Sequence, residues 1–327
     1  MGFSADILIT CAGRRVELVR CFAAARDALG FGGRVLCGDA DPSAPALHAA
    51  DAAFALPRID SGRYVDALAE IVRRERVALV VPTIDTELPA LAAARADFEA
   101  ETGARLLVSP PECIRLCRDK ALTAAFLARN GFAHPRVFSP EELATSQDLP
   151  FPLFIKPRGG SSSIGAFKVP DRRALDFFLG YVPDPIVQSC ATGQEYSVDA
   201  FLDFGGRVVS AVPRRRLAVR AGEILKGRID LNPKIVPVSR RLLECLDAIG
   251  PVTIQGFLGD DGVFQFTEVN PRFGGGAPMS IAAGADSCRW LYLLLAGQPL
   301  PPFTVRDGAA FARFDQMVET TDSQFLP

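Results

Sequence analysis

The chain of 327 residues is too long for one small core and is expected to form two or three lobes. Its composition, 49% hydrophobic and 23% charged with a formal net charge of −2, is typical of globular proteins and lacks the basic excess of a general nucleic-acid binder. It contains neither an apolar run long enough to span a bilayer nor the basic-then-apolar start of a signal peptide, so we expect a cytoplasmic protein that binds no membrane and no nucleic acid.

Short apolar runs alternate with amphipathic stretches over residues 1–110. This alternation predicts an α/β domain in which an open parallel sheet carries helices on both faces. The expected strands are Ile7–Cys11, Arg34–Cys37, Ala53–Leu56, Ala78–Val81 and Arg105–Val108. The expected helices lie near Arg14–Leu29, Arg63–Arg74 and Leu88–Ala100.

The loop that follows the first strand, Cys11–Arg15, is tight and precedes a helix, a setting in which backbone N–H groups bind anions. Asp39 and Asp41 follow the second strand, where a ribose-binding acid lies in many dinucleotide-binding proteins. The loop lacks the G-x-G-x-x-G pattern, so the sequence disfavours a nicotinamide cofactor.

Two further units are predicted, at residues 111–185 and 186–327. The first begins with two helices within Pro110–Gly131, and the proline-rich stretch Leu149–Pro152 then marks a join. The elements expected next are the strands Leu153–Pro157 and Phe167–Val169, the helix Asp171–Gly180, and the strands Ile186–Ser189 and Glu195–Leu202. They are followed by the strands Arg207–Val212 and Leu217–Val219, the helix Pro233–Ile249, a hairpin of Thr253–Gly259 with Val263–Val269, the helix Pro278–Ala296 and a last strand within Ala309–Val318.

A glycine-serine loop, Gly159–Gly165, joins two of these strands and follows Lys156. Glycines let backbone N–H groups approach phosphate oxygens closely, and the serine hydroxyls add donors. Lys156 ends an apolar strand, where an ammonium group is unfavourable without an anion. The loop is not a Walker A motif, because no Gly-Lys-Ser/Thr follows its glycines. The alternative is a hairpin loop that binds no ligand.

The most informative stretch is Phe266–Gly276. In an extended strand Glu268, Asn270 and Arg272 point to one face, because side chains alternate with period two. The two oxygen ligands suit Mg²⁺, and the guanidinium suits phosphate or carboxylate. Gln255 is expected opposite Glu268 across the hairpin, within reach of the same ion. The alternative is a half-exposed edge strand whose polar face meets water.

Three other features have both a functional and a structural interpretation. Gln188 closes an apolar strand whose edge can read an adenine, and Glu195 can hold ribose hydroxyls or be a solvated strand residue. Arg214–Arg216 either form a solvated basic turn or bind an acidic substrate or the transferring phosphoryl group. Eight scattered cysteines without a CxxC pair indicate free thiols, and two histidines exclude a histidine-rich metal site.

In this order the motifs resemble the ATP-grasp superfamily, specifically its carbamoyl-phosphate-synthase large-subunit-like branch. The resemblance covers about residues 110–300, and residues 1–110 look like the pre-ATP-grasp domain that precedes such a unit. The carrying motifs are Asp119-Lys120, Pro152–Pro157 with the glycine-serine loop, Val187-Gln188 with Gly193–Asp199, Thr253–Phe257 and Glu268–Arg272. The implied fold is a parallel-sheet domain followed by two α+β lobes.

The resemblance implies that ATP lies between the two lobes with one or two Mg²⁺ ions, or Mn²⁺ in their place. Its implied nucleotide-binding residues are Lys120, Lys156, Gly160, Ser161, Ser162, Ser163, Gln188 and Glu195, with the loop acting as a lid. Its implied metal ligands are Gln255, Glu268 and Asn270, and Arg272, Lys156 and Arg216 are the candidate catalytic residues.

The activity implied is that of a single-unit ligase. A small-molecule carboxylate attacks the γ-phosphate of ATP, and an amine or similar nucleophile then displaces phosphate from the acyl phosphate. One unit leaves no room for complete carbamoyl phosphate synthesis. The alternatives are a carboxyphosphate- or carbamate-forming subunit and a non-catalytic ATP-binding regulatory module. The interpretation allows a homodimer, and it places an anionic substrate between Cys11–Arg15, Thr83–Glu87 and Arg214–Arg216.

Overall fold

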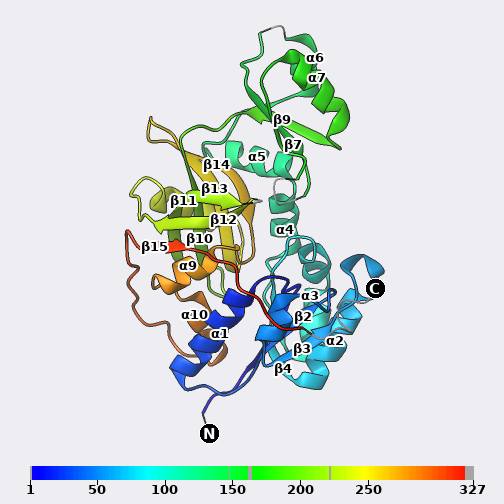
Figure 1. The fold of residues 1–327 in the computed structure, drawn as a ribbon, viewed down its shortest axis with the longest axis vertical. Coiled ribbons are helices and arrows are strands. Elements are labelled where there is room, and N and C mark those ends of the chain that lie inside the picture. The colour runs from blue at the N-terminus through cyan, green and yellow to red at the C-terminus, as the bar shows by residue number, and fades with distance from the viewer. Residues whose placement is uncertain (1, 147, 161–163, 221, 321–327) are drawn as a thin grey trace.

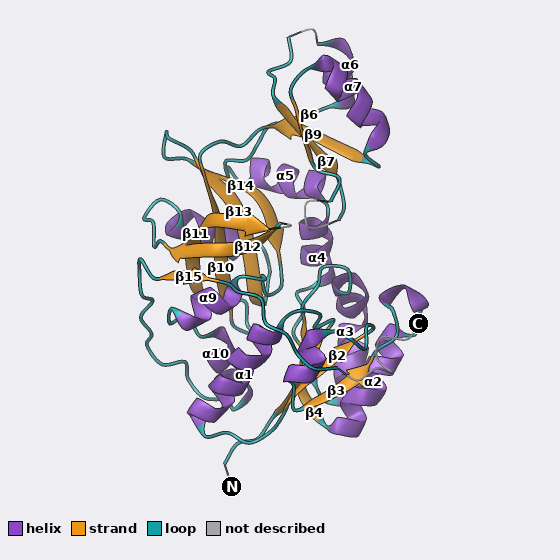
Figure 2. Ribbon diagram, viewed as in Figure 1, coloured by secondary structure: helices purple, strands orange, loops and turns teal. Residues whose placement is uncertain are grey.

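The computed structural model describes residues 2–146, 148–160, 164–220 and 222–320, so the predicted loop residues Ser161, Ser162 and Ser163 lie outside the described residues. Three sheets follow one another along the chain (Figures 1 and 2). The first is parallel, as the alternation of strands and helices predicts, and the other two are antiparallel. Among the described residues, no helix is long and apolar enough to cross a membrane.

The N-terminal sheet has five strands in the order β3-β2-β1-β4-β5. Its elements are β1 (Asp6–Thr10), α1 (Val16–Leu29), β2 (Val35–Asp39), β3 (Ala52–Ala55), α2 (Tyr64–Glu75), β4 (Val77–Pro82), α3 (Leu88–Thr102) and β5 (Arg105–Leu106), with short 3₁₀ turns at Pro45–Ala49 and Ile59–Ser61. The predicted strands and helices are therefore confirmed to within a few residues. The strand order reverses between β1 and β4, and ligands of open parallel sheets bind at such a point.

The small lobe is a sheet of four strands in the order β6-β9-β7-β8, and it projects away from the rest at the top of Figure 1. Its elements are β6 (Val137–Phe138), α6 (Pro140–Thr145), β7 (Leu153–Pro157), β8 (Phe167–Val169), α7 (Arg172–Tyr181) and β9 (Pro185–Ser189). The predicted boundary between residues 185 and 186 is wrong, because it cuts through β9, which pairs with β7 over Pro185–Ser189.

The large lobe is a sheet of six strands in the order β14-β13-β10-β11-β12-β15. Its elements are β10 (Gln194–Leu202), β11 (Val208–Arg220), β12 (Glu223–Ile229), α8 (Val236–Glu244), β13 (Gly250–Leu258), β14 (Phe264–Asn270), α9 (Ala277–Ala282), α10 (Ser287–Leu295) and β15 (Ala310–Ala312). The expected helix Pro278–Ala296 is two helices, because Gly284 takes φ +119° and a Cβ there would lie 2.2 Å from a carbonyl oxygen.

The two linker helices, α4 (Pro111–Arg118) and α5 (Lys120–Arg129), belong to the large lobe and not to the small one. Their buried side chains Cys113, Cys117, Phe126 and Leu127 share a hydrophobic cluster with the large sheet. The ring of Phe132, just after α5, packs edge-on against Phe266 of β14 at 5.7 Å. Burial of this apolar face therefore fixes α5, with Lys120 at its start, to the large sheet.

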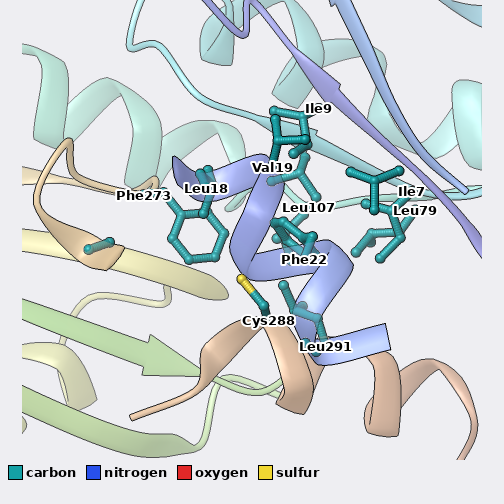
Figure 3. Close-up of a cluster of buried hydrophobic side chains, with 14 of the residues drawn as sticks. Ile7, Ile9, Leu18, Val19, Phe22, Leu79, Leu107, Phe273, Cys288 and Leu291 are labelled. Carbon is teal, nitrogen blue, oxygen red and sulfur yellow. The ribbon is translucent and has the colours of Figure 1, made fainter. Parts of the chain in front are cut away.

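One hydrophobic core joins the N-terminal domain to the large lobe (Figure 3). Helix α1 lies between the parallel sheet and α10, and its Phe22 is fully buried between them. The Phe22 ring packs edge-on against Phe273 at 6.0 Å and Tyr292 at 6.3 Å. Aromatic pairs of this kind add to the stabilisation from burial alone. The segment that follows β14 is thus anchored in a core shared by two domains.

Candidate active site

A cavity of about 390 Å³ lies between the small and large lobes. It receives side chains from β7, β8 and β9 on one side and from β10, β13 and β14 on the other. Its lining contains Lys120, Pro152, Phe154, Lys156, Pro157, Gly159, Gly160, Ile164, Ala166, Lys168, Gln188, Ser189, Cys190, Ala191, Thr192, Glu195, Gln255, Phe257, Thr267 and Glu268. The structure thus brings together Lys120, Lys156, Gly160, Gln188 and Glu195, which the sequence assigns to nucleotide binding.

Cross-strand pairing explains why the small-lobe residues face this cavity. Phe154 on β7 is opposite Lys168 on β8 and Gln188 on β9. Residues that are directly opposite share a face of the sheet, and Lys156 shares it because it is two positions beyond Phe154. Sequence reasoning missed Lys168. A signal was available, since the chain has only five lysines and three of them line this cavity.

The two phosphate-binding candidates, Lys156 and Lys120, are electrostatically strained. Burial lowers the pKa of Lys156 to about 8; Glu268 opposes this effect and the neighbouring charge of Lys120 adds to it. Burial also lowers the pKa of Lys120. The Lys120 ammonium donates to the Gly160 carbonyl oxygen at 2.8 Å, which ties it to the glycine-serine loop. An anion in the cavity would relieve both groups.

The start of α5 is held in place by Asp119. Its carboxylate caps the helix by accepting from the N–H groups of Ala121 and Leu122 at 2.9 and 3.1 Å. It also pairs with Arg158, whose Nη2 lies 2.7 Å from Asp119 Oδ2. Asp119 therefore links the large-lobe helix that carries Lys120 to the end of β7 in the small lobe.

The three predicted metal ligands lie on neighbouring strands. Gln255 is opposite Glu268, as predicted, and Asn270 is opposite Thr253. Glu268 and Gln255 line the cavity, whereas Asn270 is 5% exposed beside it. Among the described residues, none of the three side chains has a hydrogen-bond partner, which leaves their oxygens available for a cation.

This donor set fits Mg²⁺ that is shared with phosphate. It supplies one carboxylate and two amide oxygens, hard ligands that suit Mg²⁺ only when phosphate or water completes the shell. Among the described residues there is no group of three or more His, Cys, Asp or Glu side chains that could hold a metal ion by itself. The negative charge of Glu268 also raises the pKa of Lys120 and Lys156, so the carboxylate and the ammonium groups lie close together.

The arginine run Arg214–Arg216 lies inside the long strand β11, so the predicted basic turn is wrong. Strand alternation places Arg215 on the opposite face from Arg214 and Arg216, whose partners Asp199 and Glu195 share one face of β10. Arg214 is 1% exposed and pairs with Asp199, with Nη2 3.1 Å from Oδ2, while its Nη1 has no partner in the described structure. Neither residue of this pair belongs to the lining of the cavity. Arg215 instead donates to Gln194 at 3.1 Å.

Arg216 lies next to Glu195, which lines the cavity. Its Nε is 3.1 Å from Glu195 Oε1, although the Nε–H is not aligned for a hydrogen bond. Burial lowers the pKa of Arg216, and the carboxylates of Glu195 and Glu268 oppose this effect. Glu195, which is predicted to bind ribose, is therefore held by Arg216, which is predicted to be catalytic.

Arg272 lies outside the lining of the cavity and contacts the N-terminal domain. Its Nη2 is 2.8 Å from Asp85 Oδ2, on the loop that follows β4. Arg15 lies near Arg272, and the charge of Arg272 therefore adds to burial in lowering the pKa of Arg15 to about 10. Two guanidinium groups and one carboxylate thus meet where the strand order of the parallel sheet reverses.

Glu87 organises the same loop, and sequence reasoning did not single it out. It is fully buried, and it accepts hydrogen bonds from the Tyr64 hydroxyl at 2.6 Å and the Thr10 hydroxyl at 2.7 Å. It also accepts from the backbone N–H groups of Thr83 at 2.8 Å and Ile84 at 3.1 Å. Burial raises the pKa of Glu87, and the hydrogen bonds oppose this effect.

Two family descriptions match the chain. Residues 7–106 match "PylC-like, N-terminal domain", and residues 182–317 match "ATP-grasp in the biosynthetic pathway with Ter operon". A curated relative, a formate-dependent phosphoribosylglycinamide formyltransferase of Synechococcus sp. (strain CC9605), is 27% identical over 302 residues, which cover 86% of this chain and 74% of the relative.

Solved structures share the whole architecture. A biotin carboxylase in complex with β,γ-ATP from Campylobacter jejuni has a TM-score of 0.74 at 15% identity, over 92% of this chain and 73% of that one. An L-amino acid ligase from Bacillus licheniformis has a TM-score of 0.66 at 20% identity, over 90% and 75%. The predicted order of a parallel-sheet domain and two α+β lobes is confirmed.

Proposed function

We propose that the chain, whose residues 182–317 match an ATP-grasp family description, is an ATP-dependent ligase that activates a small-molecule carboxylate as an acyl phosphate and joins it to an amine. The single observation that carries the proposal is the cavity between the lobes. It combines strained lysines with oxygen ligands that have no partner in the described structure. Such a site is stabilised by a metal–polyphosphate ligand.

ATP-grasp enzymes use ATP and Mg²⁺, and the cavity offers groups for each part of this ligand. In the proposed arrangement Lys120 and Lys156 contact the phosphates, and Gln188 faces the purine. Glu195 binds the ribose after exchanging its contact with Arg216 for the sugar hydroxyls. Gly160 belongs to the proposed lid together with the loop residues 161–163 that follow it.

Mg²⁺, or Mn²⁺ in its place, would be held by Glu268, Gln255 and Asn270, and it supplies charge neutralisation at the phosphates when bound. We propose one firmly held ion, because the set contains a single carboxylate. A second ion would rely on phosphate and water for its ligands.

The proposed reaction has two steps. A carboxylate oxygen of the substrate attacks the γ-phosphorus while the bond from phosphorus to the ADP oxygen breaks, which gives an acyl phosphate and ADP. The amine nitrogen then attacks the acyl carbon, and phosphate leaves as the nitrogen loses a proton. Lys156, Arg272 and Arg216 are the cations proposed to stabilise charge on the transferring group. Positioning and charge neutralisation are the main requirements of such chemistry.

The carboxylate and the amine are proposed to enter between the cavity and the N-terminal domain. The loops after β1 and β4 meet there, and Arg15 and Arg272 give the region an excess of positive charge. An anionic small molecule suits this charge. We further propose that the enzyme acts in the cytoplasm, and size-exclusion chromatography would test whether it forms a homodimer.

The test is ADP release by the purified protein with Mg²⁺ and ATP across a panel of amino acids and carboxylic acids. ADP formation that requires both an acid and an amine supports the ligase. ADP formation that depends only on bicarbonate indicates a carboxyphosphate-forming subunit instead. Tight ATP binding without turnover under every condition indicates a regulatory module. Glu268→Ala serves as the inactive control, because it removes the only carboxylate of the proposed metal site.

A further inference from the structure

An ion pair joins the loop after β4 to the arginine that follows β14. The Oδ2 atom of Asp85 lies 2.8 Å from Nη2 and 3.3 Å from Nε of Arg272, across 187 positions of sequence. Both side chains are largely buried, with 10% of Asp85 and 13% of Arg272 exposed. Burying two charges at a domain boundary costs more than an apolar contact would, so a requirement other than stability explains the pair better.

The Asp85 side of the pair is held rigidly. Glu87 accepts from the N–H groups of Thr83 and Ile84, which fixes the loop backbone directly before Asp85. The Thr83 hydroxyl donates to the carbonyl oxygens of Thr10 and Cys11, at 2.9 Å each, at the end of β1. The loop that carries Asp85 is therefore tied to both strands at the point where the sheet order reverses.

The backbone of Arg272 is equally well fixed. Phe273 is 2% exposed and packs against Phe22 of α1 in the core shared by the two domains (Figure 3). The Thr253 hydroxyl donates to the Arg272 carbonyl oxygen at 3.2 Å. The remaining freedom of Arg272 is the direction of its guanidinium group, and the ion pair with Asp85 sets that direction.

The Arg272 guanidinium has more N–H donors than its neighbours in the described structure use. A guanidinium carries five N–H groups. In the described structure Nε and Nη2 of Arg272 donate to Asp85, and Nη1 donates to the Phe273 carbonyl oxygen at 3.3 Å. These three bonds leave two N–H groups, one on each Nη nitrogen, for a ligand. Asp85 thus holds one edge of the group and leaves the opposite edge for oxygens of an anion.

We propose that Asp85 is a positioning residue, which aims the free edge of Arg272 at the terminal phosphate of the bound nucleotide. The inference rests on the proposed function, since it presumes that ATP occupies the cavity. Asp85 acts through Arg272 and touches neither the nucleotide nor the substrate. Its charge also reaches Lys120, whose pKa it raises, so the carboxylate lies at the phosphate end of the site.

The test compares two probes, Mg²⁺ with ADP and Mg²⁺ with the β,γ-imido analogue of ATP, by calorimetric titration. Only the analogue has a γ-phosphate, so the ratio of the two Kd values isolates the group that Arg272 is proposed to contact. Because the charge of Asp85 also acts on Lys120, we expect Asp85→Asn to change the Kd for ADP at most about twofold, whereas the preference for the analogue should fall about tenfold. Arg272→Gln should reduce it at least as much, and the double variant should lose no more than Arg272→Gln alone.

A matched control is Asp6→Asn. It breaks an ion pair of the same type in the same domain, in which Asp6 Oδ2 lies 2.6 Å from Arg34 Nη2, and it should leave both Kd values unchanged. If Asp85→Asn does not fold, Asp85→Glu keeps the charge but displaces it by one methylene. That variant should lower the preference for the analogue over ADP several-fold.

Three results overturn the proposal. In the first, the preference for the analogue over ADP is unchanged in Asp85→Asn although it falls in Arg272→Gln. In the second, the losses of this preference in the two single variants multiply in the double variant. In the third, Arg272→Gln itself leaves the ratio unchanged. Failure of the unsubstituted protein to bind Mg²⁺–ADP is a separate outcome that refutes the nucleotide site, and with it the proposed function.

Discussion

Lys156→Met should stabilise the empty protein while it weakens nucleotide binding. Burial lowers the pKa of Lys156 from 10.5 to about 8. The unfolded chain then binds more protons than the folded protein between these values, so stability rises with pH from about 8 to 10.5. Below pH 8 the charged ammonium destabilises the fold in full. A pKa difference of about 2.5 corresponds to about 3 kcal/mol.

The assay is denaturant unfolding of the nucleotide-free protein at pH 7 and pH 10. Methionine keeps most of the length of the lysine stem and removes the charge, so Lys156→Met should gain about 2–3 kcal/mol at pH 7 and much less at pH 10. Lys226→Met, on the exposed part of β12, is the control and should change stability by only a few tenths of a kcal/mol. Equal or lower stability of Lys156→Met at pH 7 would refute the interpretation that the ammonium is strained.

Nucleotide binding provides the second half of the same test. Phosphates favour the charged ammonium, so binding of Mg²⁺–ADP should take up a proton above pH 8, and affinity should fall as the pH rises further. Calorimetry in buffers of different ionisation enthalpy measures this uptake. At pH 9 it should approach about 0.9 protons in the unsubstituted protein and vanish in Lys156→Met. Uptake that is unchanged in the variant would mean that another group titrates.

Three further predictions concern other parts of the site and its support. Glu268→Gln should lower substrate-dependent ADP release at least 100-fold with unchanged circular dichroism, because the proposed metal site loses its only carboxylate; near-normal turnover would contradict the assignment. Lys168→Met should raise the Kd for ADP several-fold, measured by calorimetry, because cross-strand pairing with Phe154 places its ammonium at the cavity; an unchanged Kd would count against that role. Arg214→Met should lower the free energy of unfolding by about 3–5 kcal/mol in urea, because it leaves Asp199 as a buried charge with one hydrogen bond from Ser280; a loss below about 1 kcal/mol would show that the pair is dispensable.

The sequence predicts best where chemistry follows local spacing. Glu268 and Gln255 meet across a hairpin, and the structure confirms that pairing, although it depends on a register shift between Gln255 and Gly256 as well as on the turn at residues 260–262. Lys156 faces the cavity because side chains alternate along β7: Leu153 and Ile155 are buried on one face, and Lys156 lies on the other. The parallel sheet was equally predictable, since alternating strands and helices allow few other arrangements.

Local spacing fails where a side chain is governed by a partner far along the chain. Arg214–Arg216 look like one basic cluster, yet each has a different partner, and only Arg216 pairs with a residue that lines the cavity, Glu195. Arg272 shares a strand face with Glu268 and Asn270 by simple alternation. Its guanidinium nevertheless turns to Asp85, because the chain bends after Asn270 and Phe273 anchors that bend in the core shared with the N-terminal domain. The chemistry of such a residue depends on how two domains pack, and periodicity carries no record of that packing.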